Sequence, residues 1–282
     1  MRIALVSNGN FFSTRMLAPL FAEPASEIVG AIIVRVPPGS GGRLATIARL
    51  TRRAGVRFAI HKAGSLAGPR AEGLLSPTPV FLHHLCDRHG VPYQTARSAN
   101  SPDALASLRA WKPEVLVSAS SPERLDEDAL ATAPMAAINV HWALLPRYGG
   151  IAPYFWVLRN GERETGVTVH LMARELDAGP LLRQRRVAIE PEDTSLGLQL
   201  RLTEIGAEEL VAALRDLPAS IDDARPQDLD DRTYFTWPQR TDVRAFLRRG
   251  RRLARLRDYR RMGALLDAER GRQREADRRA QR

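Results

Sequence analysis

The sequence predicts an α/β fold, with an open, mostly parallel β-sheet flanked by helices and a short, basic, helical C-terminal extension. Short apolar runs at 2–7, 28–36 and 114–118 have the length and composition of buried strands. Stretches with helical spacing of apolar residues separate these runs, as the crossover connections of a parallel sheet require. The predicted division is one α/β domain over 1–215, a linker over 216–238 and a basic helical segment over 239–282.

Composition narrows the class of protein. Of the 282 residues 44% are hydrophobic, which suffices for a packed core. No run of about 18 apolar residues occurs, so no membrane span is expected. The N-terminal apolar run lacks the long hydrophobic region and the small-residue cleavage site of a signal peptide. The single cysteine, Cys86, excludes an intrachain disulfide and suits the reducing cytoplasm.

The first strand, 2–7, leads into a glycine-containing turn at 8–11. Ser13 is the expected N-cap of a helix that continues to Phe21. Strand, turn and helix in this order is how open α/β sheets present ligands at the C-terminal ends of their strands. The turn holds only one glycine, so the dinucleotide-binding fingerprint GxGxxG is absent.

The second strand, 28–36, runs into a basic stretch. Residues 35–70 contain seven arginines and Lys62 but no acidic residue, and an amphipathic helix is expected near 42–53. An acidic substrate, a phosphate or a membrane surface would suit this charge. A solvated basic insertion is the favoured interpretation.

A helix is predicted over 77–89 and ends at Gly90. It contains His83, His84 and His89, which raises the hypothesis of a metal site. Neighbouring histidines on a helix point in different directions, and no Cys or Glu stands at ligand spacing, so no metal is predicted. The remaining elements predicted are strands over 91–93, 114–118 and 181–189, a helix from Ser101, and a helix capped by 191–194 that continues to Leu214.

Three polar side chains are expected to meet near the end of a strand over 136–141. Asn139 and His141 are two residues apart in that strand, so they project from the same face. A carboxamide beside an imidazole can donate to, and protonate, a developing oxyanion. Asp177 adds a carboxylate on the turn after a strand over 165–172. Each residue alone also fits a plain structural role, but the combination predicts an acyl-transfer site.

The pattern around these residues resembles that of the folate-dependent formyltransferases, which include the glycinamide ribonucleotide, methionyl-tRNA and amino-sugar enzymes. That pattern is Asn-x-His, Leu-Leu-Pro with a following glycine, Thr-Gly-Val-Thr and Leu-Asp-x-Gly. Ala143 replaces a usual serine and Trp142 a usually small residue. The matching positions are Asn139, His141, Leu144, Leu145, Pro146, Gly149, Thr165, Gly166, Val167, Thr168, Asp177 and Gly179.

The resemblance implies the family's Rossmann-like catalytic domain and transfer of a formyl group from 10-formyltetrahydrofolate to an amine. It implies catalytic roles for Asn139, His141 and Asp177, and no metal. It places weak substrate contacts at Asn10 and Trp142. The residues it assigns to binding of the folate donor are Val117, Ser118, Ala119, Ala143, Leu144, Leu145 and Pro146.

The acceptor amine stays open, and the C-terminal segment bears on it. Residues 239–282 hold 16 Arg against 6 acidic residues and predict two amphipathic helices, with 269–282 fraying. Transferases of the family that act on tRNA carry a much longer C-terminal β-barrel. A small amine, such as an amino sugar or a biosynthetic intermediate, is therefore favoured over methionyl-tRNA, and a nucleic-acid partner is not expected. A formyltetrahydrofolate hydrolase is the second enzymatic alternative, and the segment is a candidate homodimer contact.

Overall fold

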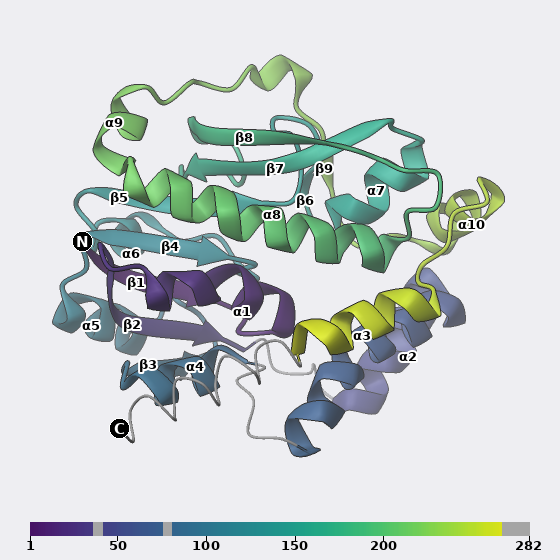
Figure 1. Ribbon diagram of the computed structural model, residues 1–282, viewed down its shortest axis with the longest axis horizontal. Helices are drawn as coiled ribbons and strands as arrows, with labels where there is room; N and C mark the ends of the chain where they lie inside the picture. The colour runs from purple at the N-terminus through teal and green to yellow at the C-terminus, as the bar shows by residue number, and fades with distance from the viewer. Residues whose placement is uncertain (36–41, 76–80, 267–282) are drawn as a thin grey trace.

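The computed structural model describes residues 1–35, 42–75 and 81–266 (Figure 1). A seven-stranded sheet in the order β3-β2-β1-β4-β5-β7-β8 forms its centre. The first five strands along the chain pair in parallel, and β7 and β8 run antiparallel to their neighbours. This confirms the predicted α/β class. The strands are β1 (Arg2–Ser7), β2 (Glu27–Val34), β3 (Tyr93–Ala96), β4 (Val115–Ala119), β5 (Ala136–His141), β7 (Glu164–Leu171) and β8 (Leu181–Ala188).

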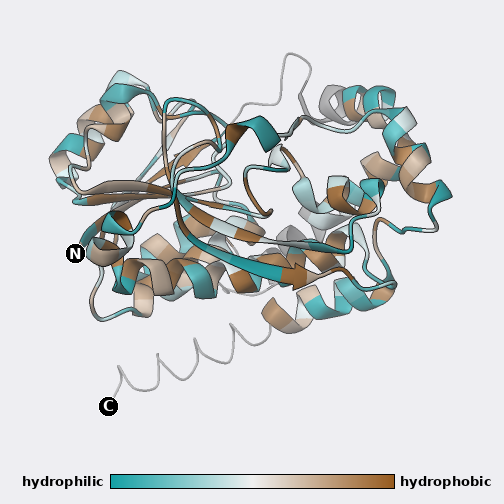
Figure 2. Cartoon of the chain, turned by 90° about the horizontal axis from the view of Figure 1, so that it is seen from above, coloured by the Kyte–Doolittle hydropathy of each residue, from teal (hydrophilic) through white to brown (hydrophobic). Residues whose placement is uncertain are grey.

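Helices cover both faces of the sheet, because the parallel strands are apolar on both sides. In β1, Ile3 and Leu5 face one hydrophobic cluster and Ala4 and Val6 face the other. Figure 2 shows that individual helices carry both hydrophobic and hydrophilic residues, as elements packed on one side only should. One face is covered by α1 (Phe11–Leu17), α4 (Leu82–His89), α7 (Pro153–Asn160) and α8 (Ser195–Arg215), and the other by α5 (Pro102–Trp111) and α6 (Glu127–Leu130).

The strand order changes direction at β1, which lies between β2 and β4. The chain therefore leaves β1 toward one edge of the sheet and returns to build the other half from β4. The C-terminal ends of strands beside such a switch point form the usual ligand crevice of an open α/β sheet. β5 ends there at His141, which places the predicted site residues at this crevice.

Two local expectations need correction. The N-cap of α1 is Asn10, whose side-chain oxygen accepts the N–H of Ser13, so the assignment of Ser13 as the cap is wrong. Ser13 instead lies inside the helix, and its single O–H is shared between the Asn8 side-chain oxygen and the Asn10 carbonyl, both 3.1 Å away. The third strand is Tyr93–Ala96 rather than 91–93.

The basic insertion forms two helices rather than one. The expected helix is present as α2 (Gly42–Ala54), and a second one, α3 (Val56–Leu75), follows it directly. α3 is not simply solvated, because Phe58 is buried and contacts the rings of Phe155 and Trp237. The start of the helix predicted over 77–89 lies outside the described residues, and α4 ends at Gly90 in the left-handed conformation as expected.

Beyond α8 the chain wraps back over the domain. It forms α9 (Leu217–Asp222), η2 (Leu229–Asp231), β9 (Tyr234–Phe235), α10 (Arg240–Arg248) and a helix over 256–266. A short 3₁₀ helix, η1 (Ala18–Ala22), follows α1, and β6 (Gly149–Gly150) pairs in parallel with β9. The fraying predicted for 269–282 lies outside the described residues. Among the helices described, none is long and apolar enough to cross a membrane.

Candidate active site

Asn139 and His141 both project from β5, and the antiparallel strand β7 brings a second imidazole beside them. The register pairs Asn139 with His170 and His141 with Thr168. Directly paired residues of neighbouring strands have side chains on the same face. Asn139 Nδ2 accordingly lies 3.1 Å from His170 Nε2. The prediction from the sequence did not include His170.

The contacts of His170 fix how the Asn139 amide is oriented. His170 Nδ1 lies 2.8 Å from the carbonyl oxygen of Leu171, which can only accept, so Nδ1 carries the proton. In a neutral imidazole Nε2 is then an acceptor, and Asn139 must present its NH₂ group rather than its oxygen. Burial lowers the pKa of His170 to about 4, against opposing contributions from Asp177 and the Leu171 carbonyl, which keeps the ring neutral.

His141 is held from two sides. Its Nε2 lies 2.8 Å from the carbonyl oxygen of Tyr148, so Nε2 donates there. Its Nδ1 lies 3.7 Å from Asp177 Oδ1, slightly too far for a direct hydrogen bond. Catalytic contacts of this length often tighten on substrate binding or pass through one water molecule. Nδ1 is therefore the ring nitrogen that remains for proton transfer.

Asp177 is a buried carboxylate on a turn with a left-handed backbone, φ 55°. Its side chain is 12% exposed, and Oδ2 accepts the N–H of Gly150 at 2.8 Å. Burial alone would raise the pKa of this carboxyl. His141, the Gly150 N–H, His170 and Arg232 outweigh burial and lower the pKa below its ordinary value, so Asp177 is ionised at neutral pH.

The loop over 142–146 is anchored to the sheet through Thr168 and Gln184. The Thr168 hydroxyl donates to the Ala143 carbonyl at 2.6 Å and accepts the Leu145 N–H at 3.2 Å. Gln184 donates to the Leu145 carbonyl at 2.9 Å, and the Leu145–Pro146 peptide bond is cis. Both backbone groups of Leu145 are thus hydrogen-bonded, which fixes the loop against the sheet.

The predicted folate-binding residues of β4 lie on the strand next to β5, which carries Asn139 and His141. Ser118 pairs with Asn139 in the sheet, so its side chain shares the Asn139 face. Its hydroxyl is buried and has no hydrogen-bond partner among the described residues. Val117 and Ala119 are buried, and their side chains pack in the cluster on the opposite face. Of the three residues, only Ser118 presents a free side-chain polar group.

The two weak substrate candidates have structural contacts of their own. The Asn10 oxygen caps α1. Trp142 follows β5 and packs with the clusters on the α1 and α8 side, where its ring meets Tyr154 edge-on at 5.8 Å. Its indole N–H is buried without a partner among the described residues. Within the described residues, neither side chain forms a hydrogen bond, ion pair or ring contact with Asn139, His141 or Asp177, so their substrate roles stay predictions.

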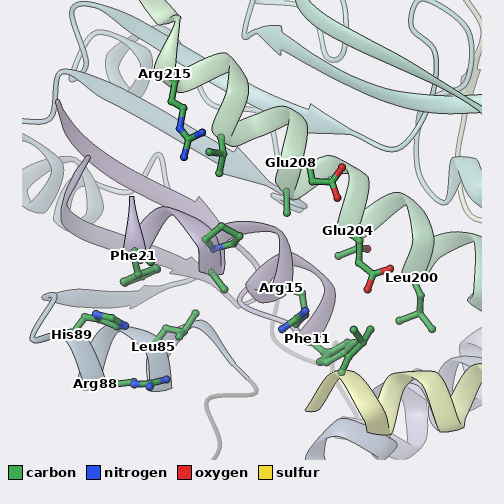
Figure 3. Close-up of a pocket in the computed structure, with 17 residues that line it drawn as sticks. Phe11, Arg15, Phe21, Leu85, Arg88, His89, Leu200, Glu204, Glu208 and Arg215 are labelled. Atoms are coloured by element: carbon green, nitrogen blue, oxygen red, sulfur yellow. The ribbon is translucent and has the colours of Figure 1, made fainter. Parts of the chain in front are cut away.

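A cavity of about 810 Å³ lies elsewhere, between α1, α4 and α8 (Figure 3). Phe11, Phe21, Leu85 and Leu200 line its apolar part, and none of the four site residues lines it.

Across the described ranges 1–35, 42–75 and 81–266, no group of three or more His, Cys, Asp or Glu is arranged to hold a metal ion.

This fold and site define a class of acyl-transfer protein, and comparison with known proteins gives the family. The family model described as formyl transferase matches residues 53–214, more than half of the chain. Two curated methionyl-tRNA formyltransferases are similar, that of Thermotoga maritima at 36% identity over 62% of this chain and that of Thermosynechococcus vestitus at 40% over 60%. The chain belongs to the formyl transferase family.

The similarity covers only part of those relatives. The matched region spans 56% of the Thermotoga maritima protein and 50% of the Thermosynechococcus vestitus protein, so the chain aligns with about half of their length. Solved structures share the fold at lower identity. A glycinamide ribonucleotide transformylase from Symbiobacterium toebii aligns with TM-score 0.56, 17% identity and coverage of 81% of this chain and 94% of that chain. A sugar N-formyltransferase from a Shewanella species aligns with TM-score 0.52, 18% identity and coverage of 84% and 76%.

Proposed function

We propose that this protein transfers a formyl group from 10-formyltetrahydrofolate to an amine of a small molecule. The observation that carries the proposal is the convergence of the Asn139 carboxamide, the His141 imidazole and the Asp177 carboxylate at the crevice end of β5. Membership of the formyl transferase family supports the formyl group as the unit transferred.

Formyl transfer needs a hydrogen-bond donor for the oxyanion that forms when the amine attacks the formyl carbon. Asn139 uses one N–H of its NH₂ group for His170, which leaves the second N–H for the oxyanion. A preoriented donor in a site with little water is worth about 10²–10³ in rate. His170 thus orients the amide, and Asn139 contacts the reacting atoms.

The reaction also moves a proton from the attacking amine to the nitrogen of the folate leaving group. Asp177 is ionised and so can accept the proton of the ammonium formed in the tetrahedral intermediate. His141 Nδ1 faces the same carboxylate. When Nδ1 carries a proton, the positive charge of the imidazolium ring stabilises the oxyanion. Asp177 then passes the ammonium proton to the folate nitrogen as the carbon–nitrogen bond breaks, which releases tetrahydrofolate and the N-formyl product.

The residues present fit a folate donor on the Asn139 face. Ser118 offers a buried hydroxyl there that the described residues leave unpartnered, which a polar group of the donor would satisfy. In this proposal Val117 and Ala119 offer the folate only their backbone, because their side chains pack on the opposite face, and the loop over 143–146 follows β5 directly. The folate supplies an activated N-acyl group. The chain supplies the hydrogen-bond donor for the oxyanion and the acceptor for the proton.

The acceptor is proposed from the comparisons as a small amine. The sugar N-formyltransferase aligns over 76% of its own chain and the glycinamide ribonucleotide transformylase over 94%. This supports a small-molecule acceptor, such as an amino sugar or a biosynthetic intermediate. The curated relatives act on methionyl-tRNA, and this specific observation makes methionyl-tRNA the second candidate. Hydrolysis of the donor to formate is the alternative that needs no acceptor.

A screen for release of tetrahydrofolate distinguishes these reactions. The protein is incubated with the formyl-folate donor and, in turn, water alone, a panel of amino sugars and small amines, and charged initiator tRNA. We expect release that depends on a small amine and changes little between 50 and 200 mM salt. Release with tRNA alone that falls steeply over that range would identify the nucleic-acid acceptor, because phosphate contacts release counterions. Equal release in water alone would identify a hydrolase.

A further inference from the structure

The segment over 225–237, called here the strap, crosses the outside of the catalytic site. In Figure 1 the chain passes from α9 over β8 and β7 and descends through β9 toward α10. The strap lies outside the residues that match the family model, 53–214. Three of its side chains and one of its backbone stretches contact the loops that carry Asp177 and the partners of His141.

Gln227 and Arg232 hold the backbone of the Asp177 turn. Gln227 Nε2 donates to the carbonyls of Asp177 and Gly179, at 3.1 and 2.6 Å. Arg232 donates to the Leu176 carbonyl at 2.8 Å and pairs with the carboxylate of Glu175 at 3.0 Å. Carbonyls on both sides of Asp177 are therefore bound by the strap.

The turn needs such support because of its backbone conformation. Asp177 has φ 55°, and a left-handed conformation costs a non-glycine residue about 1–2 kcal/mol, although Asp tolerates it better than most residues. A conformation of this kind persists only when the surroundings overdetermine it. The backbone at residue 179 packs closely against the Leu171 carbonyl oxygen. Only glycine fits there, because a Cβ atom would lie 1.9 Å from that oxygen.

The same strap holds the groups that bind the two catalytic side chains. Tyr148, whose carbonyl accepts from His141, donates its N–H to the Thr233 hydroxyl at 2.8 Å. Gly150, whose N–H binds the Asp177 carboxylate, lies in β6, which pairs with β9 of the strap. The strap thus contacts both the carboxylate side and the imidazole side of the site.

We propose that the strap is a positioning element that sets the distance between the Asp177 carboxylate and the His141 imidazole, with Gln227 and Arg232 as its positioning residues. The inference rests on the proposed function, because this pair is what moves the proton in formyl transfer. Displacements of about 1 Å in a catalytic group can lower the rate about 10²-fold.

Gln227→Leu is the cleanest test, because it removes both hydrogen bonds to the Asp177 turn without changing any charge. Asp177 faces His141, His170, Arg232 and Tyr234. Leu has nearly the volume of Gln and keeps the carboxylate buried. When the turn relaxes, the carboxylate therefore loses part of the His141 and Gly150 N–H interactions that lower its pKa while burial still raises it, and the pKa of Asp177 rises. We expect kcat to fall at least about 10-fold, KM for donor and acceptor to stay within about twofold, and the acid limb of the pH–rate profile to move to higher pH.

Three further variants sharpen the test. Arg232→Gln should lower kcat similarly, and Arg232→Lys, which keeps one donor and the charge, should restore part of it. Asp230→Asn changes an exposed strap side chain that makes no hydrogen bond or ion pair within the described residues, and it should leave kcat and the pH profile unchanged. If Gln227→Leu and Arg232→Gln lower only the unfolding temperature and keep wild-type kcat and pH profile, the strap is merely structural and the proposal is overturned.

A measurement without turnover separates this proposal from the proposed function. The Asp177 carboxyl is titrated by ¹³C NMR in the whole protein, with the signal assigned by its loss in Asp177→Asn. A higher pKa in Gln227→Leu than in wild type supports the strap as a positioning element even if no amine releases tetrahydrofolate. An identical titration in both proteins overturns it, whatever the reaction is.

Discussion

Two buried neutral histidines in this protein have very different surroundings. His170 is bonded on both sides, by Asn139 and by the Leu171 carbonyl. His61, in α3, is 4% exposed, and among the described residues neither ring nitrogen has a hydrogen-bond partner. Burial, with a smaller contribution from Lys62, lowers the pKa of His61 to about 3. A buried polar group without a partner costs about 1–3 kcal/mol of stability.

His61→Leu is therefore expected to raise the free energy of unfolding at pH 7.5 by about 1–3 kcal/mol. The advantage should grow on acidification. Because the pKa of His61 is lower in the folded state, protons bind the unfolded chain first once the pH falls below about 6.5, and wild type loses up to about 1.4 kcal/mol per pH unit from this group. Urea denaturation at pH 7.5 and 5.5 measures both effects. A variant as stable as wild type, with the same pH dependence, would contradict this account of His61.

At the same scale, the sequence indicated three residues of the candidate catalytic site and missed His170, which contacts one of them. Asn139, His141 and Asp177 were predicted because each lies at the end of an apolar strand or on a glycine-containing turn. His170 lies inside the predicted strand over 165–172, and only the antiparallel register with β5 places it against Asn139. His170 could have been predicted only by knowing that β7 runs antiparallel to β5. The residue pattern of a single strand does not reveal its direction in the sheet.

At the scale of elements, the pairing of β6 with β9 connects the site to the strap. A Cβ atom on Gly150 would lie 2.2 Å from the Phe235 carbonyl oxygen, and Gly150 has φ 89°, so glycine is needed for both reasons. The Gly150 N–H also binds the Asp177 carboxylate. The position therefore combines strand pairing with the electrostatics of the site.

Gly150→Ala is expected to separate β6 from β9 and to lower both kcat and the free energy of unfolding. Gly250→Ala is the matched control, because Gly250 has φ 74° and a Cβ atom there would meet nothing within 4 Å. The control should lose only the cost of the left-handed conformation, about 1–2 kcal/mol, with normal kcat. Equal losses in the two variants, measured by urea denaturation and steady-state rates, would show that the pairing does not matter.

Most strands and the long helix α8 were predictable because their apolar patterns are local. The strap was not, because its role depends on contacts with loops about 50–85 residues away in sequence, such as Gln227 with Asp177 and Thr233 with Tyr148. The composition of 216–238 indicated a linker, and nothing in it shows that Gln227 and Arg232 bind the turn that carries Asp177. The division of the chain at 215 and 238 stays a prediction.

At the scale of the whole molecule, the arginine-rich C-terminal segment is part of the domain's packing. Met262 and Leu266 join a cluster with Phe11, Phe12 and other residues of α1 and α8. The buried Asp258 accepts the Thr194 hydroxyl at 2.7 Å, which joins this segment to the start of α8. Arg251 and Arg257 donate to backbone carbonyls of the 190–192 loop. Several of these arginines thus bind the chain itself, and a homodimer through this segment stays a prediction.

The most direct test of the central claim is the rate of tetrahydrofolate release, with the best amine found, in Asn139→Ala, His141→Ala and Asp177→Ala. Circular dichroism and urea denaturation first establish that each variant is folded. Loss of the oxyanion donor or of the proton-transfer pair predicts rates at least about 10²–10³-fold below wild type. Rates near wild type in all three folded variants would contradict the assignment of this site.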